Sequence, residues 1–245
     1  MNFFSHKEEV PLFYCETGER ILGIGEPNHK YIVRGFHLQS KRQYLDFQRH
    51  KDFIEITKDE IDFVSYNIDK MFVLLVNSNA EVLEWIRSHI TYYNTLAAWS
   101  QIKSEILKHC EVKSTFHYYL SLANNQLKEL ETNPSPTYNS TLHFLRSLLS
   151  AEVASNFMLP SLLISDLITE AHGCKGLTNL AKLCLEKKRL SLDEEPLADK
   201  LILPFLKTEL TRISKKEVLK SGRYKLLSEC LTEYAIFIKS KYYKM

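Results

Sequence analysis

The stretch Cys15–Leu38, CETGERILGIGEPNHKYIVRGFHL, contains four of the seven glycines in a chain of 245 residues. An apolar, aromatic run, Val10–Cys15, leads into it, and a second run, Tyr31–Leu38, ends it. Both runs are typical of buried strands. Between them Gly18 precedes a short helical piece, Glu19–Leu22. Because glycine suits a positive φ or a close backbone approach, we predict a strand, a glycine turn, a short helix, a turn and a second strand.

The glycine turn has two interpretations. A glycine that leaves a strand just before a helix can expose backbone N–H groups to a phosphate. Gly23 and Gly25 form a Gly-x-Gly pair, but the third glycine and the long helix of a dinucleotide-binding motif do not follow. From these residues alone, a phosphate-binding turn and a tight connection between two strands both stay open, and the tight connection is favoured.

Downstream, the sequence predicts two more strands and two helices. Asp52–Ile56 and Glu60–Tyr66 alternate apolar and polar residues, as half-buried strands do. Asn67 has the side chain of an N-cap, and Ile68–Val76 carries apolar residues at helical spacing. The helical pattern resumes at Glu81–Arg87, after an Asn-Ser-Asn break. The first third of the chain is therefore expected to be an α/β unit.

From about Thr95 onward the pattern is helical. Apolar residues recur three and four positions apart, glycine is nearly absent, and no strand is expected. The predicted helices are Ala97–His109, Ser114–Glu131, Asn139–Asn156, Pro160–Glu170, Leu177–Lys187, Leu197–Ile213 and Gly222–Tyr242. We expect an α+β protein, with a small mixed β-sheet domain over residues 1–93 and an all-α helical domain over residues 94–245.

Composition and charge exclude several classes of protein. Hydrophobic residues make up 44% and charged residues 25% of the chain, as in ordinary globular proteins. The net charge of +2 and the short basic clusters predict a solvated surface, without a strong basic track for nucleic acid. The longest apolar runs, such as Met71–Val76, are too short to span a membrane, and the N-terminus lacks a secretory signal. Five scattered cysteines without a CxxC pair indicate reduced thiols. We therefore expect a cytoplasmic protein with no membrane partner.

The wider pattern resembles the nucleotidyltransferases of the DNA polymerase β superfamily, in particular the predicted family found beside RNA ligase and nucleic-acid repair genes of bacteria and phages. That family reads approximately ESGSRAWGFASPDSDYDVRFIYV where this chain reads ETGERILGIGEPNHKYIVRGFHL. The residues that match are Glu16, Gly18, Arg20, Gly23, Pro27, Tyr31, Val33 and Arg34. The resemblance covers about residues 10–185, including Glu60–Tyr93, Ser114–Leu130 and Leu142–Val153. It implies a nucleotidyltransferase-like fold.

The resemblance also implies a catalytic site, from which this chain departs. Members of the family carry out two-metal nucleotidyl transfer, in which carboxylates hold two divalent cations and a Gly-Ser pair holds the triphosphate. Here Glu19 replaces the serine, and Lys30 and Ile32 replace two metal-binding aspartates. The third acidic residue is retained as Asp62.

These replacements argue against the family's chemistry. An ammonium has no lone pair and an isoleucine has no oxygen, so neither can ligate Mg²⁺. A single carboxylate cannot hold two hard cations, and Glu19 would repel a polyphosphate. Two lysines of the family fall on Asn139 and Ser140. We expect a degenerate site with no assigned catalytic residue and no cofactor.

Three functional hypotheses stay open. The preferred one is a pseudo-enzyme that binds or regulates a protein or nucleic-acid partner, with a buried ion pair between Lys30 and Asp62 or Glu19 closing the old site. The second is an active nucleotidyltransferase that uses Mg²⁺ and an NTP to modify RNA, protein or a small molecule. Asp62 would then be a metal ligand, and the acids that could assist it are Glu16, Glu26 and Glu55. The third is a module that binds nucleic-acid ends. The candidate nucleotide-binding residues are Gly18, Glu19, Arg20, Lys30 and Arg34.

Overall fold

The structure, a computed structural model, describes residues 9–25, 30–48, 50–197, 201–220, 222 and 224–243. Glu26 and Pro27, which the sequence comparison singled out, lie outside the described residues. The chain forms two compact units. The first comprises residues 1–21, 25–111 and 222–245, and the second comprises residues 22–24 and 112–221. This division differs from the expected one at residue 93, because the end of the chain returns to the first unit.

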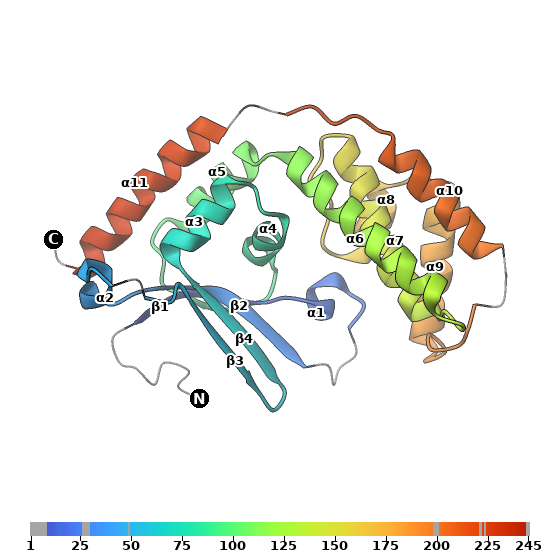
Figure 1. The fold of residues 1–245 in the computed structure, drawn as a ribbon, viewed down its shortest axis with the longest axis horizontal. Coiled ribbons are helices and arrows are strands. Elements are labelled where there is room, and N and C mark those ends of the chain that lie inside the picture. Colours follow the sequence, from blue (N-terminus) through green and yellow to red (C-terminus); the bar gives the residue numbers. More distant parts are fainter. Residues whose placement is uncertain are drawn as a thin grey trace. The chain divides into compact units, whose positions relative to one another are not determined.

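The first unit is built on a mixed five-stranded sheet (Figure 1). Its strands are β1 (Val10–Glu16), β2 (Tyr31–Leu38), β3 (Phe53–Lys58), β4 (Ile61–Asn67) and β5 (Thr91–Asn94). They are ordered β3-β4-β2-β1-β5, with β2 and β4 parallel and the other neighbours antiparallel. The four strands predicted from the sequence are confirmed. The fifth, β5, was missed, because all four of its residues are exposed and show no alternation of burial.

The parallel pairing of β2 with β4 sets the register of the candidate site. Ile32 lies opposite Asp62, and Arg34 lies opposite Val64. In the antiparallel partner β3, Thr57 lies opposite Asp62. Positions that are about thirty residues apart in the sequence thus become direct neighbours in the sheet.

Helices cover one side of this sheet (Figure 1). The helices of the first part of the chain are α1 (Glu19–Leu22), α2 (Lys41–Leu45), α3 (Ile68–Val76), α4 (Ala80–Arg87) and α5 (Trp99–His109). The predicted N-cap is confirmed, because the Asn67 side chain accepts a hydrogen bond from the Asp69 N–H. In the core, the rings of Phe13, Phe36 and Trp99 pack with centroids 5.4–5.5 Å apart.

The last helix, α11 (Tyr224–Tyr243), belongs to the first unit. Its Tyr234 hydroxyl donates to the Ala97 carbonyl at 2.6 Å. Near its end, the Tyr243 hydroxyl donates to the Gln39 carbonyl, also at 2.6 Å. The sequence placed this segment in the helical domain, because a helical pattern does not say which surface the helix covers.

The second unit is entirely helical in the part of it that the structure describes. Its helices are α6 (Val112–Thr132), α7 (Tyr138–Ser155), α8 (Ile164–Glu170), α9 (Lys175–Arg189) and α10 (Ile202–Ser214). The centre is α7, which is buried on nearly all sides and packs most extensively against α6. Its N-terminus is fixed by a capping box between Thr137 and Ser140. The predicted α+β class, a small mixed sheet followed by helices, is confirmed.

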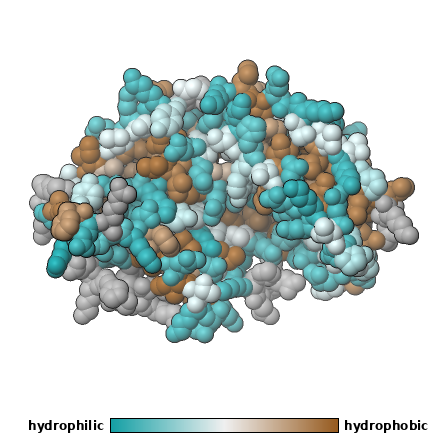
Figure 2. All heavy atoms as spheres, in the orientation of Figure 1, coloured by the Kyte–Doolittle hydropathy of each residue, from teal (hydrophilic) through white to brown (hydrophobic). Residues whose placement is uncertain are grey.

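The visible face of the molecule is mostly hydrophilic, with hydrophobic residues scattered over it (Figure 2). Single exposed hydrophobic side chains of this kind are normal on a folded protein. Among the described residues, no helix is both long enough and apolar enough to cross a bilayer.

Candidate functional site

The glycine turn holds the end of β1 against the start of β2. Gly18 has a φ of +72°, a left-handed conformation that glycine adopts without strain. Just before it, the Thr17 N–H and hydroxyl both donate to the Ile32 carbonyl, at 2.8 Å and 3.1 Å. A Cβ added to Gly18 would lie 2.6 Å from Cδ1 of Ile32. Ile32, which the resemblance places at a metal-binding position of the family, therefore packs directly on the turn.

Asp62, the acidic residue that the chain retains, is engaged by Arg34. The Arg34 guanidinium Nη1 lies 3.0 Å from the Asp62 carboxylate and also donates to the Asp62 and Val33 carbonyls. Both side chains are partly buried, 15% exposed for Arg34 and 32% for Asp62. Burial raises the pKa of Glu81 on α4, and the positive charge of Arg34 offsets part of this rise.

The predicted ion pair thus involves a different cation. The sequence analysis expected a buried Lys30 to pair with Asp62 or Glu19. Lys30 is only half-buried, and among the residues that the structure describes none forms an ion pair with it. Lys30 lies just before β2 begins. Arg34 lies on β2, two residues after the Ile32 that pairs with Asp62, and its side chain reaches the Asp62 carboxylate.

Glu16 is the most buried acidic residue near the turn, with no exposed surface. One carboxylate oxygen accepts a hydrogen bond from the Ile32 N–H at 2.9 Å, and the other accepts a short one from the Tyr92 hydroxyl. Burial and the neighbouring carboxylate both raise the pKa of Tyr92, so its hydroxyl stays protonated. Tyr92 was not identified from the sequence, because its strand, β5, was not predicted.

The described carboxylates of this region are not grouped as ligands of two metal ions. Across the described residues, no group of three or more His, Cys, Asp or Glu side chains is placed to hold a metal ion. Asp62 is paired with Arg34, and both oxygens of Glu16 are hydrogen-bonded within the fold. Glu55, the other candidate acid that the structure describes, is exposed on β3 opposite Val64. The carboxylates that the structure describes therefore do not fit two hard cations.

Arg20, Tyr31 and Tyr92 form an aromatic and basic surface beside the glycine turn. The Arg20 guanidinium on α1 lies over the Tyr31 ring, 4.3 Å from its centroid, a cation–π contact. Tyr31 is 42% exposed and Tyr92 is 47% exposed. Tyr92 and Arg20 are close enough for the cation to lower the phenol pKa, although burial raises it overall.

Asn139 and Ser140, which the resemblance aligns with two lysines of the family, have structural roles in the second unit. The Asn139 side chain donates to Glu194 at 2.8 Å and accepts from Lys188 at 3.2 Å. Ser140 takes part in the capping box with Thr137. Both residues are thus used within the helical unit.

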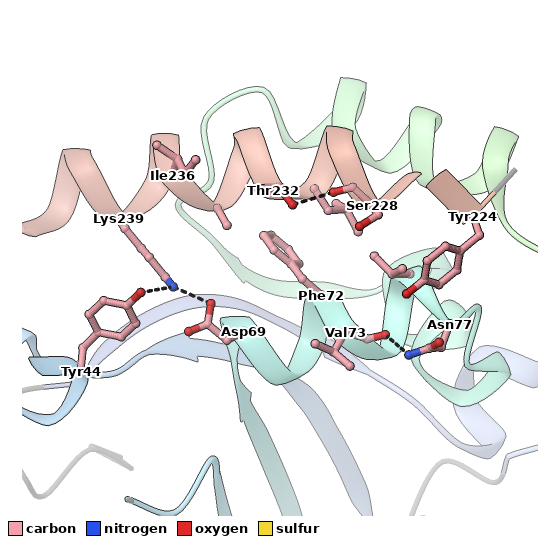
Figure 3. Close-up of a pocket in the computed structure, with 13 residues that line it drawn as sticks. Tyr44, Asp69, Phe72, Val73, Asn77, Tyr224, Ser228, Thr232, Ile236 and Lys239 are labelled. Atoms are coloured by element: carbon pink, nitrogen blue, oxygen red, sulfur yellow. Dashed lines mark hydrogen bonds and ion pairs between the residues drawn. The ribbon is translucent and has the colours of Figure 1, made fainter. Parts of the chain in front are cut away.

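A separate groove lies between α3 and α11 in the first unit (Figure 3). It has a volume of about 400 Å³, and Phe72 points from α3 toward α11 across it. At one end Lys239 forms an ion pair with Asp69 at 2.6 Å and a hydrogen bond to the Tyr44 hydroxyl at 3.1 Å. The family-motif residues of the glycine turn do not line this groove.

Comparisons with known proteins identify the family. The model of the RlaP family, the RNA repair pathway DNA polymerase beta family, matches residues 2–236. The Bacillus subtilis (strain 168) protein YcgL, named as uncharacterized, is 24% identical over 206 residues, covering 82% of this chain and 79% of its own length. A solved nucleotidyltransferase-like protein from Exiguobacterium sibiricum 255-15 aligns with 98% of this chain and 76% of its own. It is 8% identical with a TM-score of 0.30, a level that does not imply a shared fold. The match over nearly the whole chain shows that this protein belongs to the RNA repair pathway DNA polymerase beta family.

Proposed function

We propose that this protein is a catalytically degenerate, nucleotidyltransferase-like protein that acts as a binding or regulatory module. The proposal rests on the residues that surround the Asp62 carboxylate. Its carboxylate is paired with Arg34, and its neighbour across the strands is the apolar Ile32. Two-metal catalysis requires carboxylates that share two cations, and neither residue opposite or beside Asp62 supplies one.

The glycine turn supports the same proposal. In a phosphate-binding turn, the space beside the glycine has to accept the phosphate. Here the Ile32 side chain lies against Gly18, and Glu19 adds a negative charge at the start of α1. Both features disfavour a triphosphate at this place.

Ligand-dependent thermal unfolding tests the proposal. We expect no increase in Tm with any of the four NTPs, with or without Mg²⁺ or Mn²⁺. A metal-dependent increase with one NTP, lost in Asp62→Ala, would show that the site is active. As a positive control, the triple variant Glu19→Ser, Lys30→Asp and Ile32→Asp restores the family's ligand set. Metal-dependent NTP binding gained by that variant supports the proposed ancestry.

A second candidate function, the binding of nucleic-acid ends, is favoured by the aromatic and basic surface. Exposed tyrosines can stack on unpaired bases, and Arg20 and Lys30 supply positive charge beside them. Fluorescence anisotropy with a labelled single-stranded RNA at low salt tests this function. We expect Tyr31→Ala to weaken binding about tenfold, and Tyr224→Ala, an exposed tyrosine on α11, to leave it unchanged. No binding at low salt would exclude this second function. The proposal of a degenerate site does not depend on that result.

A further inference from the structure

A cavity of about 540 Å³ lies beside the edge strand β5, within the first unit. Residues from β5 and from the first turn of α5 line it, together with Phe13 and Ile86. Its volume is in the range of pockets that hold small ligands. None of Gly18, Ile32 and Asp62 lines it, so it is distinct from the family site.

Lys103 supplies a positive charge to this cavity. Its side chain is half-buried, and burial lowers the pKa of its ammonium, with a further lowering from the nearby Arg87. Among the described residues, no carboxylate forms an ion pair with Lys103. On the same helix, by contrast, Lys108 pairs with Glu105 at 3.5 Å. A half-buried ammonium is stabilised by an anion, because burial without a counter-ion costs free energy.

The other walls suit an anion that carries an apolar group. The Asn94 side-chain oxygen accepts a hydrogen bond from the Leu96 N–H at 3.0 Å, which leaves its NH₂ group as the donor end. Thr91 adds a hydroxyl to the lining. Phe13 and Trp99, which are 2% and 6% exposed, contribute the edges of their rings as an apolar floor. Ligand pockets commonly combine such walls with a few convergent polar groups.

We propose that this cavity binds a small oxyanion, a phosphate or a carboxylate, attached to a compact apolar group, with Lys103 as its counter-ion. The proposal is independent of the degenerate site. It requires neither a metal ion nor an NTP, and it does not depend on the activity of the protein.

Isothermal titration calorimetry of the full chain with four probes tests the assignment. The probes are phenyl phosphate, benzoate, inorganic phosphate and phenol. We expect saturable binding of phenyl phosphate or benzoate, at least fivefold weaker binding of inorganic phosphate, and no binding of phenol. The difference between phenyl phosphate and benzoate identifies which oxyanion the cavity prefers. Absence of saturable binding of both ring-bearing anions up to about 10 mM would overturn the proposal.

Variants of α5 locate the site. Lys103→Met keeps the aliphatic stem and removes the charge, so we expect binding at least tenfold weaker, with Lys103→Arg close to wild type. Lys108→Met is the matched control and should bind as the wild type does. Circular dichroism establishes that each variant is folded. Wild-type affinity in folded Lys103→Met, or phenol binding equal to that of phenyl phosphate, would overturn the role of the cation. Equal affinity for inorganic phosphate would overturn the assignment of the apolar group.

Discussion

Single residues decide how the candidate site can act. Ile32 and Arg34 lie two positions apart on β2, and both bear on the proposal of a degenerate site. Ile32 replaces an oxygen ligand with a side chain that packs on Gly18, while Arg34 neutralises Asp62. Arg34 matches the family pattern, so its ion pair with Asp62 is not itself a departure. The departure that we propose is Ile32 in place of an aspartate, with no further carboxylate grouped with Asp62 among the described residues.

Substitution of Gly18 tests the tight turn. We expect Gly18→Ala to lower the free energy of unfolding by about 1–2 kcal/mol, because φ is +72° and the new Cβ meets Ile32. Gly173→Ala is the control, since no atom lies within 4 Å of its added Cβ. Urea unfolding measures both variants. The double variant Gly18→Ala/Ile32→Ala should recover the steric part of the loss. A neutral Gly18→Ala would contradict the close packing.

His37 provides a prediction on pH. Burial lowers its pKa to about 4, from an ordinary value of 6.5, and its Nδ1 lies 2.8 Å from the Ser65 hydroxyl. Between these two values the unfolded chain binds a proton that the folded chain does not, so stability falls as pH falls from about 6.5 toward 4. Urea unfolding at pH 7, 6 and 5 should show this loss. His37→Gln should flatten the slope over this range, whereas His50→Gln should not. An unchanged slope in the His37 variant would contradict the assignment.

At the scale of elements, strands were predicted where apolar and polar residues alternate, and helices where apolar residues recur three and four positions apart. The four longer strands and most of the helices follow from these two patterns. The Asn67 cap was predicted from its residue type. The exposed β5 and the short α2 (Lys41–Leu45), which has no buried residue, carry no such signal. The site was predicted in the same way. The motif singles out the positions of the candidate site, which stay a prediction, and the ion-pair partner of Asp62 depended on strand pairing, which the sequence did not reveal.

The attachment of β5 can be tested through Tyr92. Tyr92→Phe removes the hydroxyl that donates to buried Glu16, so we expect a loss of about 1–3 kcal/mol of unfolding free energy. Tyr93→Phe is the matched control on the same strand, and its ring is similarly exposed. Thermal or urea unfolding compares the two. Equal stabilities would show that the Glu16 contact does not hold the edge strand.

At the scale of the whole molecule, the first unit combines residues 1–21 and 25–111 with the distant segment 222–245. The link is α11, whose Tyr234 and Tyr243 hydroxyls donate to backbone carbonyls of residues far away in the sequence. Phe72 of α3 and Tyr234 also pack with ring centroids 6.1 Å apart. The domain division could not be derived from composition, because α11 has the same helical pattern as the helices of the second unit.

Removal of α11 tests this organisation. For a chain that ends after residue 220, we expect faster amide hydrogen exchange in α3 and α5, because Phe72 and Ala97 lose their partners. Protection in α7 of the second unit should persist. Leu226→Ser, an exposed residue of α11 that does not line the groove, is the control and should leave exchange unchanged. Unchanged protection in α3 after truncation would contradict the role assigned to α11.

The return of α11 to the first unit also has a consequence for synthesis of the protein on the ribosome. The sheet is made early, but its last helix is translated only after the whole second unit. At typical translation rates the delay is on the order of ten seconds. During that time the surfaces of α3 and α5 that α11 covers lack their partner, while the second unit can already fold. The nascent chain therefore passes through a stage in which exposed apolar residues such as Phe72 are open to chaperones or to wrong pairing.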